Sequence, residues 1–265
     1  MRSPTGPEQP LGDRLDSHRQ DWEDLSRLDP LWAILSFRRH KFGRWDEAAF
    51  LATGERQVAD LLQRCDHLGR PGARAAVLDF GCGVGRLAPG LAERFDRYVG
   101  VDISRGMISR ARALHADRPN CAFVTSADGS VEAVTGAHPA VFDLVVSYYV
   151  LQHLPDPALI AGSVEAFLSR LAPDGLLVFQ LPDRISRPES LVHDARRGLY
   201  RFLRRRGLDE AFLFRRLHVF PMAMHSVPTD TVVAMVTHLG GRVLDVDSGP
   251  WGMGRRNAVY YVSPS

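Results

Sequence analysis

Two hydrophobic patterns alternate along most of the chain. Short apolar runs of the kind that form buried strands are separated by longer segments in which apolar residues recur every three or four positions, as they do in amphipathic helices. This alternation predicts a parallel α/β sheet with helical crossovers. The expected strands are Ala75–Asp79, Arg97–Val101, Ala122–Thr125, Leu144–Ser147 and Leu176–Leu181.

Helical patterns lie between these strands and also before the first of them. We expect crossover helices at Arg86–Arg94, Ser104–His115 and Ala158–Leu171, with a less regular helical segment at Ser130–His138. Ahead of the sheet, the region from Leu25 to Cys65 has apolar residues at helical spacing. That region predicts two or three helices that precede the sheet.

The spacing of the patterns changes after the fifth strand. Two helices are expected there, at Glu189–Arg206 and Glu210–Leu217. A further helix at Thr229–Leu239 precedes two strand-like runs, Arg242–Val246 and Ala258–Val262, which are joined by a segment rich in glycine and proline. This ending predicts an antiparallel hairpin at one edge of the sheet and brings the expected number of strands to seven.

The patterns divide the chain into five segments. Residues 1–20 are polar and contain three prolines and two glycines, so we expect a disordered tail. Residues 21–70 are expected to form a helical cap, and residues 71–182 the main part of the sheet with its helices. Residues 183–225 form a helical insertion that can act as a lid, and residues 226–265 complete the core with the last helix and the hairpin.

Composition and charge exclude several classes of protein. No apolar run approaches the roughly 18 residues that span a bilayer, and the first segment lacks the apolar stretch of a signal peptide, so we expect a cytoplasmic protein without a membrane partner. A formal net charge of +2 is too small to indicate a polyanionic partner. The cysteines Cys65, Cys82 and Cys121 lie far apart, which indicates neither a disulfide framework nor a zinc site.

A glycine-rich loop follows the first expected strand. Gly81, Gly83 and Gly85 stand at alternate positions directly after the buried run that ends at Asp79 and Phe80. Glycines let the backbone turn sharply and approach a ligand at a distance that a side chain would block. A loop of this kind that leads into a helix predicts a binding site for a nucleotide or another anionic group.

The spacing of this loop narrows the choice of cofactor. The fingerprint of dinucleotide-binding proteins is GxGxxG, whereas this loop reads GxGxG and places Arg86 where a dehydrogenase has its third glycine. Asp79 precedes the loop at a position where a carboxylate can meet an ammonium group. The second strand is followed by Asp102, about 20 residues further on, as a carboxylate that binds ribose hydroxyls requires. These features favour an amino-acid-bearing nucleoside over a nicotinamide dinucleotide.

With these residues the chain resembles the class I S-adenosylmethionine (SAM) dependent methyltransferases over roughly Ala75–Leu181. The segments FDLVVS, Phe142–Ser147, and LAPDGLLVFQLP, Leu171–Pro182, are similar to the fourth-strand and fifth-strand motifs of that family. The resemblance implies a Rossmann-like, seven-stranded and mostly parallel sheet with an antiparallel last strand. It also implies SAM as the cofactor and S-adenosylhomocysteine (SAH) as the product.

The resemblance assigns cofactor contacts residue by residue. It implies that Asp79 and the three loop glycines surround the methionine moiety and that Asp102 binds the ribose hydroxyls. Ile103 would pack on the adenine. Asp128, with Gly129 beside it, matches the acidic residue that contacts the adenine amino group in the family; an ordinary Asp-Gly turn is the alternative.

The family also implies that the Ser147–His153 segment borders the transferred methyl group, which places Ser147 at the cofactor. His153 has three possible roles there: a general base, a wall of the cofactor site, or a structural histidine. His225, before the last helix, is a second candidate base. Arg44, in the helical cap, is expected either to reach the cofactor carboxylate or only to pack.

Together the motifs predict an enzyme that transfers a methyl group to a small-molecule or natural-product acceptor, with oxygen as the favoured acceptor atom. The insertion contains ten arginines and five acids, which leaves open a lid, an oligomer interface or an anion-binding surface. A nucleic-acid or protein methyltransferase is therefore an alternative, although SYYV stands where amino-directed nucleic-acid enzymes have an Asn-Pro-Pro-Tyr type motif. A second alternative is a member of the fold that binds SAM but transfers no methyl group. No metal is expected, because no Asp/Asn cluster follows the fourth strand.

Overall fold

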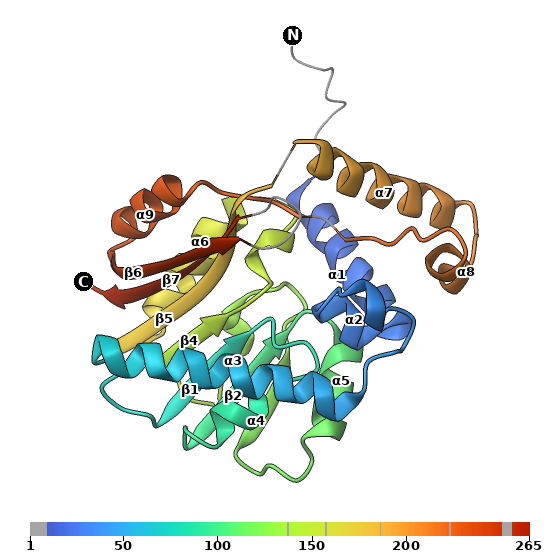
Figure 1. The fold of residues 1–265 in the computed structure, drawn as a ribbon. Coiled ribbons are helices and arrows are strands. Elements are labelled where there is room, and N and C mark those ends of the chain that lie inside the picture. The colour runs from blue at the N-terminus through green and yellow to red at the C-terminus, as the bar shows by residue number, and fades with distance from the viewer. Residues whose placement is uncertain (1–9, 137, 157, 186, 223, 251–255) are drawn as a thin grey trace.

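A seven-stranded sheet forms the centre of the structure, with the strand order β3-β2-β1-β4-β5-β7-β6 (Figure 1). The computed structural model describes residues 10–136, 138–156, 158–185, 187–222, 224–250 and 256–265. The strands are β1 (Ala76–Phe80), β2 (Arg97–Asp102), β3 (Cys121–Thr125), β4 (Phe142–Ser147), β5 (Leu171–Arg184), β6 (Gly241–Pro250) and β7 (Arg256–Pro264).

The first five strands are parallel, and β7 is antiparallel to both of its neighbours, β5 and β6. The hairpin of β6 and β7 closes one edge of the sheet, so the Rossmann-like fold expected from the sequence is confirmed. Strand β5 begins earlier than expected, at Leu171. It starts with a pairing between Phe142 and Leu171 and passes an irregularity in the register before Leu144 pairs with Leu176.

Helices cover both faces of the sheet. They are α1 (Leu11–Leu28), α2 (Pro30–Ile34), α3 (Glu47–Leu68), α4 (Ala88–Ala92), α5 (Arg105–Leu114), α6 (Ala158–Ser169), α7 (Arg187–Arg205), α8 (Glu210–Arg215) and α9 (Thr229–His238), with short 3-10 helices η1 (Arg38–His40), η2 (Val131–Ala133) and η3 (Leu151–His153). The expected helix at Ser130–His138 is only the single turn η2 in the part that the structure describes.

Two apolar clusters, one on each face, hold the helices to the sheet. Val164 and Phe167 of α6 and Val232 of α9 belong to one cluster, and the other includes Leu61 of α3 and Leu91 of α4. The strands carry apolar residues on both faces because both are covered, which is the usual arrangement of a parallel sheet. Their buried runs are therefore continuous rather than alternating, as the sequence showed.

Helix α1 corrects the expectation of a disordered tail. The helix begins at Leu11, so residues 11–20 are ordered as a helix, and residues 1–9 lie outside the described part of the chain. Leu25 of α1 is fully buried in a third apolar cluster, against Trp22 of the same helix and residues of α2, α5 and α8. This tertiary burial stabilises a segment whose prolines and glycines alone suggest disorder.

The helical insertion packs on α1 through buried ion pairs. Asp21 of α1 accepts hydrogen bonds from Arg197 at 3.0 Å and from Arg201 at 2.7 Å. Asp24 accepts one from the hydroxyl of Tyr200 at 2.6 Å. Both aspartates are buried, and α7 lies across the top of α1 (Figure 1). Helix α1 is therefore held between the sheet below and the insertion above.

Candidate functional site

The strand order defines where a ligand site is expected. Starting from β1, the chain adds β2 and β3 on one side and then turns back to place β4 on the other side. A crevice forms where the order reverses, at the carboxyl ends of the two central strands. The glycine loop follows β1 and the segment Tyr148–Val150 follows β4, so both of these segments border the crevice.

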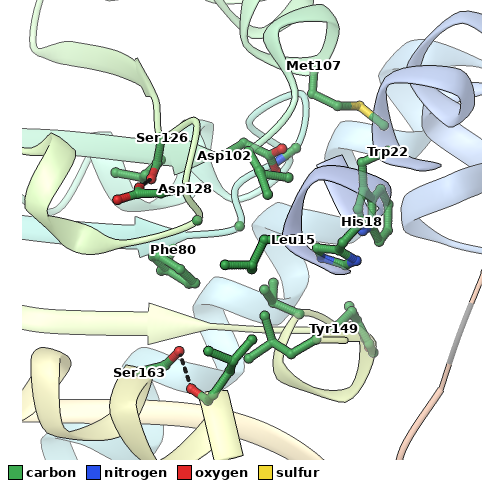
Figure 2. Close-up of a pocket in the computed structure, with 18 of the residues that line it drawn as sticks. Leu15, His18, Trp22, Phe80, Asp102, Met107, Ser126, Asp128, Tyr149 and Ser163 are labelled. Atoms are coloured by element: carbon green, nitrogen blue, oxygen red, sulfur yellow. Dashed lines mark hydrogen bonds between the residues drawn. The ribbon is translucent and has the colours of Figure 1, made fainter. Parts of the chain in front are cut away.

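A cavity occupies this position (Figure 2). It contains about 870 Å³ of space free of protein atoms, a volume that includes open solvent at its mouth. One side is formed by the ends of the first four strands, and Leu15, His18 and Trp22 of α1 face them from the opposite side (Figure 2). Of the expected site residues, the cavity is lined by Gly81, Gly83, Asp102, Ile103, Asp128 and Gly129.

The glycine loop needs its glycines for two physical reasons. Gly81 has φ of 74° and Gly83 has φ of 57°, both in the left-handed region that other residues rarely adopt. A Cβ atom on Gly81 would also lie 2.2 Å from a side-chain carbon of Val150, and one on Gly83 would lie 2.6 Å from Ile34. Gly85 does not line the cavity, because its position is packed against His115 and a Cβ would come within 2.8 Å of that ring.

Asp102 connects the glycine loop to the end of β2. Its Oδ2 accepts a hydrogen bond from the backbone N–H of Gly83 at 2.9 Å, and its Oδ1 accepts one from Ser104 at 2.9 Å. Burial raises the pKa of Asp102 to about 6, although these backbone donors act in the opposite direction. Each carboxylate oxygen keeps acceptor capacity for a further donor in the cavity.

Asp79 lies below the loop and does not line the cavity. It is buried, and its Oδ2 accepts a hydrogen bond from the hydroxyl of Tyr98 at 2.7 Å. Burial raises the pKa of Asp79 to about 7, against the effects of the Tyr98 hydrogen bond and the charge of Arg86. A direct contact between this carboxyl and a bound cofactor, as the resemblance implied, is therefore not provided by the arrangement seen here.

Asp128 and Ile103 stand at the ends of neighbouring strands. The Oδ1 atom of Asp128 accepts hydrogen bonds from the hydroxyl of Ser126 at 2.9 Å and from the backbone and hydroxyl of Ser130. The Ser130 backbone contributes most to holding its pKa below the ordinary value. A Cβ on Gly129 would meet Ile103 at 3.5 Å, so the turn after β3 packs beside the apolar side chain that follows β2.

The structure brings three histidines together near α1. His18 lines the cavity, whereas His153 and His225 do not. The ring of Trp22 contacts the ring of His153 edge-on, with 5.5 Å between centroids. Burial, together with the charge of His153 and of arginines on α7, lowers the pKa of His18 to about 3, so this side chain is neutral near pH 7. Burial also lowers the pKa of His225, whose buried Nε2 has no hydrogen-bond partner among the residues that the structure describes.

Two other expected site residues lie outside the cavity. The side chain of Arg44 is exposed and does not line it. Ser147 is fully buried in β4 and the cavity wall is formed by Tyr148 and Tyr149 instead. Tyr149 adopts φ of 62°, an uncommon conformation for a residue with a side chain that occurs where a site constrains the backbone.

Sequence reasoning missed the contribution of α1. Leu15, His18 and Trp22 line the cavity, although the sequence placed Leu15 and His18 in a disordered tail. Glu23 on the same helix accepts hydrogen bonds from the backbone of Arg105 at 2.6 Å and of Gly106 at 3.2 Å, which are free donors at the N-terminus of α5. The spacing of Leu11, Leu15, Trp22 and Leu25 is helical and was the available signal.

This fold, with a cavity at the point where the strand order reverses and acidic residues at the ends of β2 and β3, is that of the class I SAM-dependent methyltransferases. A family model described as a methyltransferase domain matches residues 50–217. The chain belongs to this family. SAM is the methyl donor of the family, and similar solved structures contain SAM or SAH.

Curated relatives match the central part of the chain. A ubiquinone biosynthesis O-methyltransferase of Neisseria meningitidis is 36% identical over 118 residues, which is 44% of this chain and 47% of the relative. A trans-aconitate 2-methyltransferase of Streptomyces avermitilis is 33% identical over 162 residues, 57% of this chain and 58% of the relative. The chain thus matches about half the length of these relatives.

Solved structures show the same fold over nearly the whole chain. The 1,6-didemethyltoxoflavin-N1-methyltransferase of Burkholderia thailandensis, with its acceptor and SAH bound, has a TM-score of 0.64 at 16% identity and covers 99% of this chain and 93% of its own. The N-methyltransferase NodS of Bradyrhizobium japonicum, with SAH, has a TM-score of 0.58 at 19% identity and covers 94% and 100%.

Proposed function

We propose that the protein transfers the methyl group of SAM to an oxygen atom of a small molecule that enters the cavity beneath α1. The observation that carries this proposal is the continuity of the cavity, which joins Asp102 and Asp128 to His18 and Trp22. The relative from N. meningitidis is named an O-methyltransferase, which supports oxygen as the acceptor atom.

The residues at the strand ends fit the nucleoside part of SAM. Asp102 has carboxylate oxygens at the cavity that can accept hydrogen bonds from the two ribose hydroxyls. Ile103 supplies an apolar surface for the adenine ring. The hydrogen bonds from Ser126 and Ser130 go to the Oδ1 atom of Asp128, so its Oδ2 atom can accept one from the adenine amino group. Gly81 and Gly83 let the backbone approach the methionine part closely.

Asp79 supports this site without touching the ligand. Its buried carboxyl accepts a hydrogen bond from Tyr98 of β2 and so holds the end of β1, from which the glycine loop starts. Arg86, also buried, donates a hydrogen bond to Gln57 of α3 at 2.6 Å. These buried contacts hold the loop in one geometry, which a cofactor site requires.

The acceptor is placed between the cofactor residues and α1. SAM, when bound, supplies a methyl group on a positively charged sulfur, and the protein must align the acceptor oxygen behind that bond and exclude water. Trp22, Tyr149, Leu154 and Leu159 give this end of the cavity an apolar lining. The site therefore suits a largely apolar or aromatic acceptor that has one polar group to be methylated.

His18 is the histidine that such an acceptor can reach. Its neutral imidazole can accept a hydrogen bond from an acceptor hydroxyl and so orient the oxygen. His153 lies against Trp22, and the backbone N–H of His225 donates to the carbonyl of Gln152 at 2.7 Å. His153 and His225 are the bases expected from the sequence. We propose that they do not contact the acceptor and instead help to position α1, which lines the cavity.

The contacts of the insertion weigh against a nucleic-acid substrate. Arg197 and Arg201 bond to Asp21, and Arg204 bonds to Glu210 at 3.1 Å. These three arginines are partly buried and paired with carboxylates of the protein, so they are not themselves free to bind phosphates. A small-molecule acceptor agrees better with the enclosed cavity.

Incubation with methyl-labelled SAM and a panel of phenols, hydroxy acids and carboxylic acids tests the proposal. We expect a labelled product with at least one acceptor and one SAH formed for each product molecule. Asp102→Ala is the matched inactive control. A protein that binds SAM but forms no SAH above this control with any acceptor would instead be a member of the fold that transfers no methyl group.

A further inference from the structure

Helix α7 presents its apolar side to solvent. At about 100° per residue, Leu191, Val192, Ala195, Leu199 and Phe202 lie on one side of the helix, and we name them the outer face of α7. All five are exposed; Leu191 is 69% exposed and Phe202 is 53% exposed. An amphipathic helix on a globular protein normally turns such a side toward the core, whereas α7 packs Tyr200 and Leu203 inward and leaves these five residues in solvent.

This orientation is fixed by the opposite side of the helix. Arg197 and Arg201 bond to the buried carboxylate of Asp21, and Tyr200 bonds to Asp24. Turning the outer face inward would separate these buried charges from their partners, which is costly. The outer face of α7 therefore stays at the surface, and Figure 1 shows the helix lying above α1, with no helix or strand of the described residues over it in this view.

Exposed arginines follow the C-terminal end of the outer face along the chain, and one of them contacts it. The guanidinium of Arg206 lies over the ring of Phe202 at 5.0 Å. The exposed acids in the described part of this segment are Asp194 and Asp209, and Asp209 already caps α8 through the N–H of Phe212. Four exposed arginines follow the outer face along the chain: Arg205, Arg206, Arg215 and Arg216.

We propose that the outer face of α7 binds the surface of a membrane that contains anionic lipids. An exposed apolar helix face that is followed by exposed arginines can enter the boundary between lipid headgroups and acyl chains while the arginines bind the headgroups. The positive charge favours such a surface over a second copy of this chain, which has the same charge beside the same face. The acceptor cavity is covered by α1, the helix on which α7 rests.

The proposed contact differs from the expectation, drawn from the lack of a long apolar run, that the protein has no membrane partner. Among the residues that the structure describes, no helix combines the length and the apolar character needed to cross a bilayer. The proposed binding is peripheral, with α7 parallel to the membrane plane.

Sedimentation with lipid vesicles tests this proposal and does not depend on methyl transfer. The full chain is mixed with vesicles of phosphatidylcholine alone or of phosphatidylcholine with phosphatidylglycerol. We expect binding to the mixed vesicles that weakens with added salt, and at least about tenfold weaker binding to phosphatidylcholine alone. Replacing both Arg205 and Arg206 by alanine should weaken binding to mixed vesicles roughly thirtyfold.

Phe202→Glu tests the apolar part of the contact, and Val141→Glu is its matched control. Both side chains are about half exposed, so neither substitution disturbs the core. We expect Phe202→Glu to abolish binding and Val141→Glu to leave it unchanged. Equal binding by the two variants, or no binding of the wild-type chain to mixed vesicles, would overturn the proposal. So would a stable dimer in solution that Phe202→Glu converts to monomers, because a second copy would then cover the face.

Discussion

The backbone N–H of Gly83 donates a hydrogen bond to Asp102 at 2.9 Å. This bond joins the glycine loop after β1 to the carboxylate after β2, which are the two features of the sequence that indicate a SAM site. The second oxygen of Asp102 is held by Ser104 at the start of α5. The carboxylate is thus oriented by backbone groups on two sides before any ligand arrives, an arrangement that lowers the entropic cost of binding.

Gly83→Ala should lower both stability and SAM affinity. Alanine at φ of 57° costs about 1 to 2 kcal/mol, and the new methyl group would push against Ile34 at the cavity wall. Gly162→Ala in α6 is the control, because nothing lies within 4 Å of its Cβ position; we expect it to be neutral or stabilising by about 0.5 kcal/mol. Urea unfolding and SAM titration of both variants measure these effects, and equal behaviour would contradict the role given to the loop.

Asp21→Ala should loosen α1 over the cavity. The change leaves the partly exposed Arg197 and Arg201 without their buried partner, which costs about 2 kcal/mol in the free energy of unfolding. We also expect a higher KM for the acceptor, because α1 forms one wall of its site. Asp16→Ala is the control on the same helix; the Asp16 side chain is 74% exposed, and its loss should change stability by less than about 0.5 kcal/mol. An unchanged KM in Asp21→Ala would argue against α1 as the acceptor wall.

The raised pKa of Asp79 makes stability depend on pH. Its carboxyl has a pKa near 3.8 in the unfolded chain and about 7 in the folded protein without cofactor. Between these values the unfolded chain releases a proton that the folded protein keeps, so stability falls as pH rises and the loss is complete above about pH 7. Asp79→Asn should therefore gain about 2 kcal/mol relative to the wild type between about pH 5 and about pH 8.

Asp102 changes the pH dependence of stability in the same direction as Asp79, and His18 changes it in the opposite direction. The difference in the free energy of unfolding between Asp79→Asn and the wild type therefore isolates the contribution of Asp79. Asp96→Asn, an exposed carboxylate near the start of β2, serves as the control and should show no such gain. Urea unfolding at the two pH values is the measurement. A constant difference between Asp79→Asn and the wild type across this range would mean that Asp79 is ionised in the folded protein.

His18→Gln should affect the acceptor and spare the cofactor. If the neutral imidazole orients the acceptor oxygen, its loss lowers kcat/KM for the acceptor by at least about tenfold, while the Kd of SAM changes by less than about twofold. His67→Gln is the control, because His67 is on α3, away from the cavity lining. A fall in SAM affinity that matches the fall in activity would instead make His18 part of the cofactor site.

The elements that were predicted well from the sequence are those whose hydrophobic pattern is local. Strands β1 to β4 were placed within one or two residues, because each is a buried run bounded by polar or glycine-rich turns. The start of β5 was missed because Leu171 joins the sheet only through its pairing with Phe142. That pairing is a contact between distant segments and leaves no mark in the local pattern.

The acceptor side of the site was the part that sequence reasoning could not place. Helix α1 depends on partners more than 80 residues away, such as the contact of Glu23 with Arg105, and on Asp21 with Arg201. The cofactor side was easier, because Gly81, Gly83 and Asp102 are fixed in space by the strand ends on which they stand. Arg44 had no such anchor, and the structure places it on the surface.

Calorimetric titration of the purified chain with SAM, SAH and NADH tests the central claim most directly. We expect one SAM or SAH to bind each chain, no binding of NADH, and a loss of affinity of about 2 kcal/mol, roughly thirtyfold, in Asp102→Ala. Asp117→Ala, an exposed carboxylate after α5, should bind SAM as the wild type does. A folded wild-type chain that binds neither SAM nor SAH, or an Asp102→Ala variant that binds them with unchanged affinity, would contradict the account.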